Sequence, residues 1–251
     1  MENLIKKLDL NEYITNFSKL FAREKSIILE GDINIHYKII SELSKYNINQ
    51  PLSVQNLDSQ LMHLQKQGVL RVYEIYEFIK IINYFLYLKR FNFEGKLLEW
   101  MDKIIIPNDI LKICEYFDDK ANLKEGVDED FDNIKQAIYK NKEEIKQSLY
   151  KTINSSKIKP YLVDMQVHFI NEQECLLVRG GFNHILSGSV IDRSNSGFFY
   201  VIPHSVSDLK QKQSDLKNKQ EEILFRLCKE ISHIFERNLL FLKFINKEFD
   251  K

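Results

Sequence analysis

The segment ILSGSVIDRSNSGFFYVIP, residues 185–203, decides the fold of this chain. Two apolar stretches flank the turn-forming residues Ser-Asn-Ser-Gly at 194–197, and this pattern predicts a β-hairpin. Gly197 can adopt the positive φ that a tight turn requires, and Pro203 lacks the amide hydrogen that would extend a strand ladder. A long charged stretch with helical spacing follows at once, over roughly forty residues. A hairpin that leads directly into such a helix favours an arm with a β-rich tip.

The order of special residues in this segment is distinctive. A strand containing a glycine leads into an Asp-x-Ser-x-Ser-Gly turn, and an apolar strand then ends in proline before a long helix. This order resembles bacterial proteins of the MutS-II branch. Phe198 and Phe199 stand where that family usually has a small residue and Thr, and Ile202 stands where it usually has Glu. The matching residues are Gly188, Asp192, Ser194, Ser196, Gly197 and Pro203.

Two upstream segments resemble the same family in the same order. Residues 49–91 are similar to an N-terminal helical segment in which a glycine separates two helices, with Gly68 and Glu74 at the matching places. Residues 117–155 are similar to a segment in which an acidic turn opens a long helix. The resemblance therefore extends over nearly the whole chain.

Periodicity predicts a mainly α fold with a small antiparallel β subdomain. Apolar residues between Ile75 and Leu88 form a wide helical stripe, whereas those between Ile134 and Leu149 form a narrow one, as in an arm helix. Four of the eight glycines and two of the four prolines fall between residues 160 and 203, and this part predicts strands near 166–170, 175–179, 186–192 and 198–202. We expect a helical base and a projecting helical arm, or lever, that a β-rich clamp caps. The expected segments are a helical core (1–112), an outgoing lever helix (113–160), the β clamp (161–203) and a returning long helix (204–251).

Composition limits the class of protein without naming a function. The 251 residues carry 36 basic and 36 acidic side chains, which argues against a surface wholly coated by polyanion. Cys114, Cys175 and Cys228 are few and odd in number, so we expect free thiols in a reducing cytoplasm. No apolar run is long enough to span a membrane, and we expect no membrane partner.

Charge is unevenly distributed along the chain. Acidic residues dominate 115–132, and lysines dominate 133–160. One explanation is that these charges complement the dipole of a single helix. The other is a basic end that contacts phosphates, and neither is excluded by the sequence. No base-reading or stacking module is evident, so any contact with nucleic acid should be directed to the backbone and to shape. The candidate binding residues are Lys151, Lys157, Lys159, Arg179 and Arg193.

Sequence motifs for catalysis are missing. The chain has no glycine-rich phosphate loop followed by Lys and Ser or Thr, no His-Glu-x-x-His and no Cys-x-x-Cys pair. Ser194 and Ser196 lack the Gly-x-Ser-x-Gly context of a nucleophile and are interpreted as turn hydroxyls. We therefore assign no catalytic residue and no metal ligand.

The resemblance implies a larger protein than this chain. MutS-II proteins join such an arm to a dimerising ABC-type ATPase and a C-terminal Smr nuclease domain, and they are linked to branched-DNA binding, suppression of recombination and, in some members, the splitting of stalled ribosomes. We expect an N-terminal, non-catalytic lever and clamp fragment that engages branched DNA. ATP and magnesium would serve the absent ATPase, and the full-length protein would be a homodimer. The alternatives are a protein-interaction or dimerisation arm and an arm that engages the ribosome or structured RNA.

Overall fold

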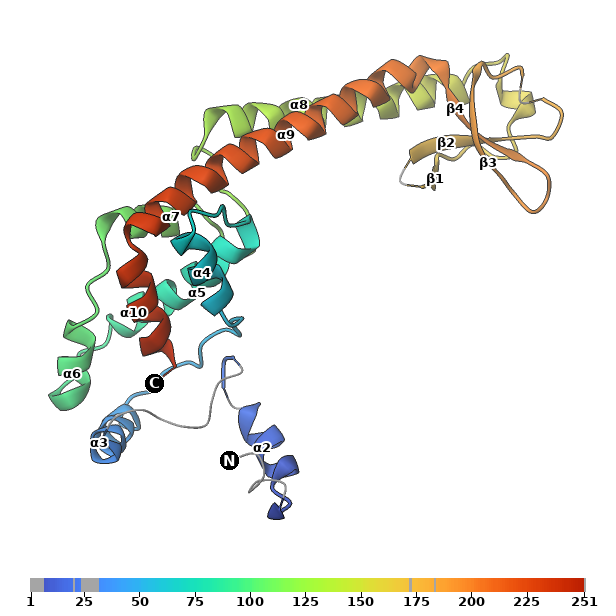
Figure 1. The fold of residues 1–251 in the computed structure, drawn as a ribbon. Coiled ribbons are helices and arrows are strands. Elements are labelled where there is room, and N and C mark those ends of the chain that lie inside the picture. Colours follow the sequence, from blue (N-terminus) through green and yellow to red (C-terminus); the bar gives the residue numbers. More distant parts are fainter. Residues whose placement is uncertain (1–6, 20, 24–31, 172, 183, 251) are drawn as a thin grey trace. The chain divides into compact units, whose positions relative to one another are not determined.

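The computed structural model describes residues 7–19, 21–23, 32–171, 173–182 and 184–250. Parts of the predicted helical core (1–6, 20 and 24–31), two residues of the predicted clamp (172 and 183) and residue 251 lie outside these ranges. The described residues form nine α-helices, one 3-10 turn and four strands (Figure 1). In chain order these are α2 (Asn11–Ser18), α3 (Ile33–Leu43), α4 (Asp58–Gln65), α5 (Val72–Leu88), α6 (Gly95–Asp102), α7 (Asn108–Glu115), α8 (Glu129–Ile153), η1 (Lys159–Tyr161), β1 (His168–Ile170), β2 (Gln173–Val178), β3 (Gly188–Arg193), β4 (Phe199–Pro203), α9 (His204–Arg237) and α10 (Leu239–Phe249).

The chain divides into two compact units. Unit 1 comprises residues 1–127 and 225–251, and unit 2 comprises residues 128–224. The predicted fold class, mainly helical with a small antiparallel sheet, is confirmed. The projection of an arm and the segment boundaries at 112, 160 and 203 stay predictions.

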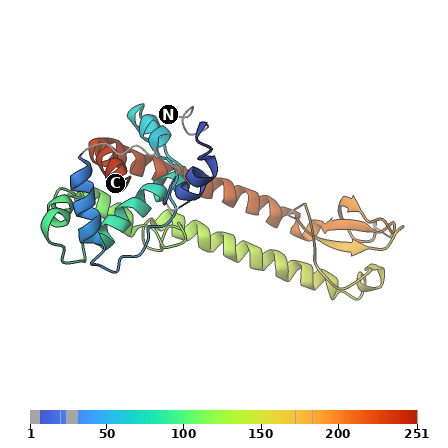
Figure 2. The ribbon, with the colours of Figure 1, turned by 90° about the horizontal axis from the view of Figure 1, so that it is seen from below.

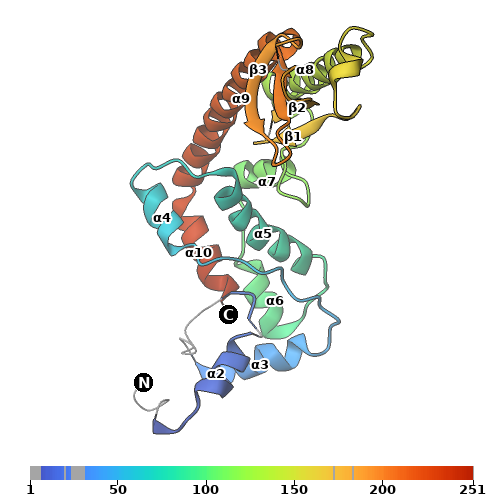
Figure 3. The ribbon, with the colours of Figure 1, turned by 90° about the vertical axis from the view of Figure 1, so that its right-hand side faces the viewer.

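Helix α5 is the centre of unit 1. Its apolar stripe is buried on several sides, and Phe78 packs edge-to-face on Phe235 of α9 with ring centroids 5.5 Å apart. Figure 3 shows α10 beside both α5 and α4. Phe78, Phe85 and Phe235 are almost completely buried, and burial of each such side chain contributes about 1.5–3 kcal/mol. The wide apolar stripe in the sequence thus marks the core helix of this unit.

The entry to α5 depends on Gly68 and Glu74. A Cβ atom at Gly68 would lie 2.3 Å from ring atoms of His63, so any other residue would require this exposed imidazole to move. Glu74 Oε2 accepts a 2.8 Å hydrogen bond from the amide of Arg71, which satisfies one of the free donors at the helix start. These contacts fix the direction in which the chain enters the core.

The prediction of one long helix over residues 204–251 is wrong. The structure has α9, which ends at Arg237, and a separate α10, which begins at Leu239. Asn238 lies between them with φ −102° and ψ 21°, and its amide Nδ2 donates a 2.9 Å hydrogen bond to the carbonyl of Ile234. Because an asparagine side chain can replace backbone hydrogen bonds in this way, it ends the first helix.

Unit 2 contains α8 and the first part of α9, which run antiparallel to one another (Figures 1 and 2). Ser148 Oγ donates to the carbonyl of Ser205 at 3.3 Å, and Asn141 Nδ2 donates to that of Leu209 at 3.1 Å. Asn141 is fully buried, and within the described chain its Oδ1 has no hydrogen-bond partner. The narrow apolar stripe of α8 is therefore one side of a helix pair.

The start of α8 explains part of the acidic cluster before it. Asp128 Oδ1 accepts a 2.8 Å hydrogen bond from the amide of Phe131, which makes Asp128 the N-cap of the helix. Glu129, Asp130 and Asp132 follow in the first turn, where carboxylates interact favourably with the helix dipole. Complementation of the helix dipole thus accounts for the acidic residues at the start of α8.

The sheet of unit 2 has strand order β1-β2-β4-β3, and every neighbouring pair is antiparallel. Cys175, Leu176, Val178 and Val201 from the sheet are buried with apolar residues of α8 and with Val206 of α9. The four strand predictions are confirmed to within two residues at each end. Pro203 is the last residue of β4 and pairs with Gly188, and α9 begins at the next residue.

Candidate nucleic-acid interface

One end of the sheet brings two of the five candidate cations into neighbouring positions. Val178 at the end of β2 and Arg193 at the end of β3 both pair with Phe199 at the start of β4. Arg179, the residue after Val178, therefore lies at the same end of the sheet as Arg193. We call this region, residues 178–182 and 193–199, the arginine end.

Arg179 is held by the segment that follows α8. Its backbone amide donates to the carbonyl of Tyr161 at 2.9 Å, and its side-chain Nε donates to the carbonyl of Leu162 at 3.2 Å. Leu162 also forms an antiparallel bridge with Val178. These contacts hold Nε of an exposed guanidinium group. Its terminal nitrogens have no acidic partner among the described residues.

Arg193 lies over an aromatic ring. Its guanidinium carbon is 5.4 Å from the ring centroid of Phe199, a cation–π distance. One of its terminal nitrogens lies 3.5 Å from the point where a Cβ atom on Gly197 would stand. The contact directs the positive charge toward the hairpin turn, and within the described chain no carboxylate forms an ion pair with it.

A shallow hollow of about 410 Å³ opens at the arginine end. Gly180 and Gly197 approach closely at this hollow, since a Cβ atom on Gly180 would lie 3.0 Å from the carbonyl oxygen of Gly197. Without side chains on these two glycines, a ligand can approach the backbone directly. The lining residues are Val163, Arg179, Gly180, Ser196, Gly197 and Phe198.

The three lysine candidates lie near the segment between α8 and the sheet. Lys159 begins η1, whose last residue is bonded to Arg179, and Lys157 lies in the turn just before it. Lys151 is in the last turn of α8, where a cation also complements the helix dipole. All three are exposed, and among the described residues no hydrogen bond or ion pair joins Lys151 to the arginine end.

Two curated proteins of Helicobacter pylori align with nearly all of this chain. Endonuclease MutS2 of strain 26695 is 32% identical over 252 residues, which are 98% of this chain and 33% of that protein. Endonuclease MutS2 of strain J99 is 33% identical over 252 residues, with the same two coverages. This chain is homologous to a region of MutS2. It spans about a third of the length of these relatives, and no family model matches it.

The turn motif of this MutS2-like region has identifiable contacts. Gly197 has φ +82° and its amide donates to the carbonyl of Ser194 at 2.9 Å, while Ser194 Oγ accepts from the amide of Phe198 at 3.1 Å. Asp192 Oδ1 accepts from the amide of Arg193 at 2.7 Å. A Cβ atom on Gly188 would lie 2.3 Å from the carbonyl oxygen of Ile202. Each of these contacts shapes the β3–β4 hairpin on which Arg193 is carried.

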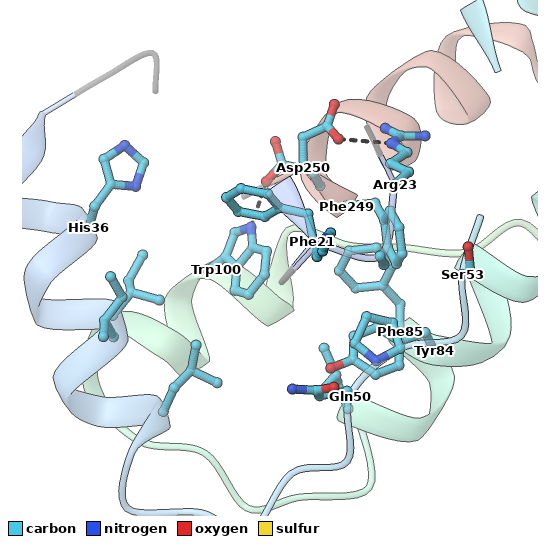
Figure 4. A pocket seen from close by; sticks show the side chains of 18 residues that line it. Phe21, Arg23, His36, Gln50, Ser53, Tyr84, Phe85, Trp100, Phe249 and Asp250 are labelled. Carbon is cyan, nitrogen blue, oxygen red and sulfur yellow. Dashed lines mark hydrogen bonds and ion pairs between the residues drawn. The ribbon is translucent and has the colours of Figure 1, made fainter. Parts of the chain in front are cut away.

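The MutS2-like chain also has a pocket of about 440 Å³ in unit 1 (Figure 4). Two carboxylates in this pocket have donors: Arg23 Nε donates to Asp250 Oδ1 at 2.8 Å, and Trp100 Nε1 donates to Glu248 Oε2 at 2.5 Å. Arg23 also donates two hydrogen bonds to Asn246, at 2.6 Å and 2.7 Å. These side chains tie α10 to the rest of unit 1 and form no arrangement of nucleophile and base.

The histidines and thiols offer no reactive centre in the described ranges. His168 Nε2 lies 3.0 Å from both oxygens of Asp164, and His184 and His204 are exposed. No three His, Cys, Asp or Glu side chains of the described residues gather in a geometry suited to a metal ion. Burial raises the pKa of Cys175 and of Cys228 to about 11, which keeps both protonated near neutral pH.

An aromatic pair, formed by one residue of the arginine end and one from η1, is missing from the sequence prediction. Tyr161 and Phe182 lie with ring centroids 5.0 Å apart and their planes tilted by 38°. Phe182 follows Gly180-Gly181 and is 41% exposed. The signal in the sequence was a bulky aromatic directly after two glycines, but its partner lies in a different segment.

None of the described helices combines the length and apolar character needed to cross a bilayer.

Proposed function

We propose that unit 2 contacts the sugar–phosphate backbone of branched nucleic acid, as the lever and clamp of a MutS2-like protein that acts in control of recombination. The observation that carries the proposal is the location of Arg179 and Arg193 at the same end of the sheet, beside the backbone of two glycines. The relatives are named endonucleases, a class that acts on nucleic acid, and the homology covers all of unit 2. In this proposal ATP and magnesium serve an ATPase region outside residues 1–251.

Guanidinium groups suit this role because their planar set of donors matches phosphate oxygens. Arg179 is oriented through its Nε and Arg193 through the ring of Phe199, so both lose little freedom on binding. The amides and hydroxyl of the hairpin turn add neutral donors beside the charge. Such contacts recognise the course of a backbone and not its base sequence, which fits a protein that responds to branched shapes.

The proposal is tested by neutralising three cations together, Lys157→Gln, Arg179→Gln and Arg193→Gln, and by titrating a labelled four-way DNA junction over a series of salt concentrations. Each lost phosphate contact should reduce the slope of log affinity against log salt by about 0.9, so the triple variant should lose roughly two to three units of slope. Affinity should fall at every salt concentration.

The control carries the same change of charge in unit 1, with Lys66→Gln, Lys103→Gln and Lys112→Gln, all of which are exposed. It should bind the junction like the unchanged chain. Equal losses in the two triple variants would show that only net charge matters and would overturn the proposal, as would unchanged binding by the first variant.

The same variants separate the alternative functions. One outcome is that the unchanged chain cosediments with ribosomes but fails to bind the junction. If the triple variant with Arg179→Gln and Arg193→Gln then loses cosedimentation, the arginine end is assigned to structured RNA of the ribosome. A stable dimer that binds no nucleic acid at any salt concentration would favour the protein-interaction arm. Either result would replace branched DNA as the target.

A further inference from the structure

Phe182 is an exposed aromatic residue that follows Gly180-Gly181 at the arginine end. Its amide donates to the carbonyl of Arg179 at 3.2 Å, and its carbonyl accepts from the amide of Ile185 at 3.0 Å. The residue is nevertheless 41% exposed. Part of it is therefore open to a flat partner.

Tyr161 supports this ring from behind. The two centroids are 5.0 Å apart, and Tyr161 belongs to η1, whose position is fixed by the hydrogen bond from the amide of Arg179 to its carbonyl at 2.9 Å. The two aromatic residues and Arg179 therefore form one connected group that spans two segments of the chain. Phe182 thus contacts Tyr161 and is also partly exposed to solvent.

We propose that Phe182, supported by Tyr161, stacks on an unpaired base of the nucleic acid whose phosphates Arg179 and Arg193 contact. This inference rests on the proposed function and adds a ligand class, nucleic acid with unpaired nucleotides. Bases within a continuous duplex already stack on their neighbours and do not present a face, whereas bases at a gap, loop or branch point do. Every base has such a face, so the contact discriminates by strand structure and not by sequence.

The position of the arginines makes a nucleotide the fitting partner. A nucleotide presents a flat apolar surface and a negative charge on the same unit, and the arginine end presents an exposed aromatic ring and two guanidinium groups. Among the described residues, neither guanidinium forms an ion pair with a carboxylate. An apolar helix or strand of another protein would use the ring but leave these charges without a counterpart.

The test compares Phe182→Leu with Phe182→Trp. Leucine keeps an apolar side chain but removes the flat ring, and tryptophan keeps it. The probes are two labelled DNA duplexes of equal length, one fully paired and one with a central gap of unpaired thymines. We expect Phe182→Leu to lose roughly tenfold in affinity for the gapped duplex with little change for the paired one, and Phe182→Trp to retain the preference for the gap.

The matched control is Phe169→Leu. Phe169 is 69% exposed on β1 of the same sheet, and it pairs with Glu174 near the start of β2, away from the arginine end. This variant should bind both probes like the unchanged chain. The same probes in RNA are measured in parallel, and a gap preference that is lost in Phe182→Leu with either sugar supports the inference.

A second readout does not depend on affinity. A 5-iodouracil placed in the gap should form a photo-crosslink that peptide mass spectrometry assigns to Phe182 or Tyr161. An unchanged gap preference in Phe182→Leu, an equal loss for both probes, or crosslinks only to other segments would overturn the stacking inference. Failure of the unchanged chain to bind the four-way junction as well as both probes with a salt dependence would instead overturn the proposed function, so the two failures are distinguishable.

Discussion

Ser232 Oγ accepts a 2.8 Å hydrogen bond from the backbone amide of Leu70, and both groups are buried in unit 1. The contact joins α9 to the residues that precede α5. We expect Ser232→Ala to lower the free energy of unfolding by about 1–3 kcal/mol, because the amide would stay buried without an acceptor. Urea unfolding followed by circular dichroism measures this difference.

Ser214→Ala is the control for this prediction, since Ser214 is exposed on the same helix. It should change the free energy of unfolding by less than about 0.5 kcal/mol. A Ser232→Ala variant as stable as the control would mean that water replaces the serine hydroxyl.

Asn141 is a polar residue in the apolar contact between α8 and α9. Its Nδ2 has a partner in the carbonyl of Leu209, whereas its buried Oδ1 has none within the described residues. We expect Asn141→Leu to stabilise unit 2 by about 1 kcal/mol, because it removes a buried acceptor without a donor. Gln147→Leu, an exposed change on the same helix, should leave the urea midpoint nearly unchanged. A lower midpoint for Asn141→Leu would show that the leucine does not fit between the helices.

Gly188 lies where β3 approaches β4 most closely. A methyl group there would meet the Ile202 carbonyl oxygen at 2.3 Å and Val201 Cγ1 at 2.9 Å, so the strands would have to separate. We expect Gly188→Ala to cost about 1–3 kcal/mol and to increase amide hydrogen exchange along β4. Ser189→Ala, at the exposed neighbouring position, serves as the comparison. Equal exchange in the two variants would mean that the hairpin tolerates the extra methyl group.

Because of the three thiols, the free energy of unfolding should depend on pH in the alkaline range. Burial raises the pKa of Cys114 to about 12 and the pKa values of Cys175 and Cys228 to about 11, from 9.0. A raised pKa means that the unfolded state loses its protons first, so the stabilising contribution is complete below pH 9 and declines as the pH rises toward 11 or 12. The urea midpoint should therefore fall above pH 9. At pH 8 to 9, alkylation by iodoacetamide should be much slower in the native chain than in urea. Native thiols that react at the rate of free cysteine would contradict this prediction.

The hairpin was predictable because its signals are local. Gly197 and Ser194 carry the turn through contacts within a few residues, and apolar residues on both sides of the turn mark the two strands. The break between α9 and α10 was not predicted, since apolar residues continue at helical spacing on both sides of Asn238. Only the side-chain hydrogen bond of Asn238 to Ile234 reveals why the first helix ends.

The candidate interface was predictable in part. Charge alone indicated Arg179 and Arg193, but their nearness depends on β4 lying between β2 and β3, which no local pattern specifies. Lys151 was selected by the same count of charges, and in the structure it also suits the end of α8. The contact between Tyr161 and Phe182 was not predicted, because ring contacts between distant segments produce no periodic pattern in a sequence.

The hydrogen bond from Trp100 to Glu248 has a practical consequence, because Trp100 is the only tryptophan in the sequence. Indole emission from this chain reports on unit 1 alone, and unit 2 contributes only the weaker signal of its tyrosines. Tryptophan fluorescence and far-ultraviolet dichroism should therefore give separate transitions if the two units melt independently, and one shared transition if they do not.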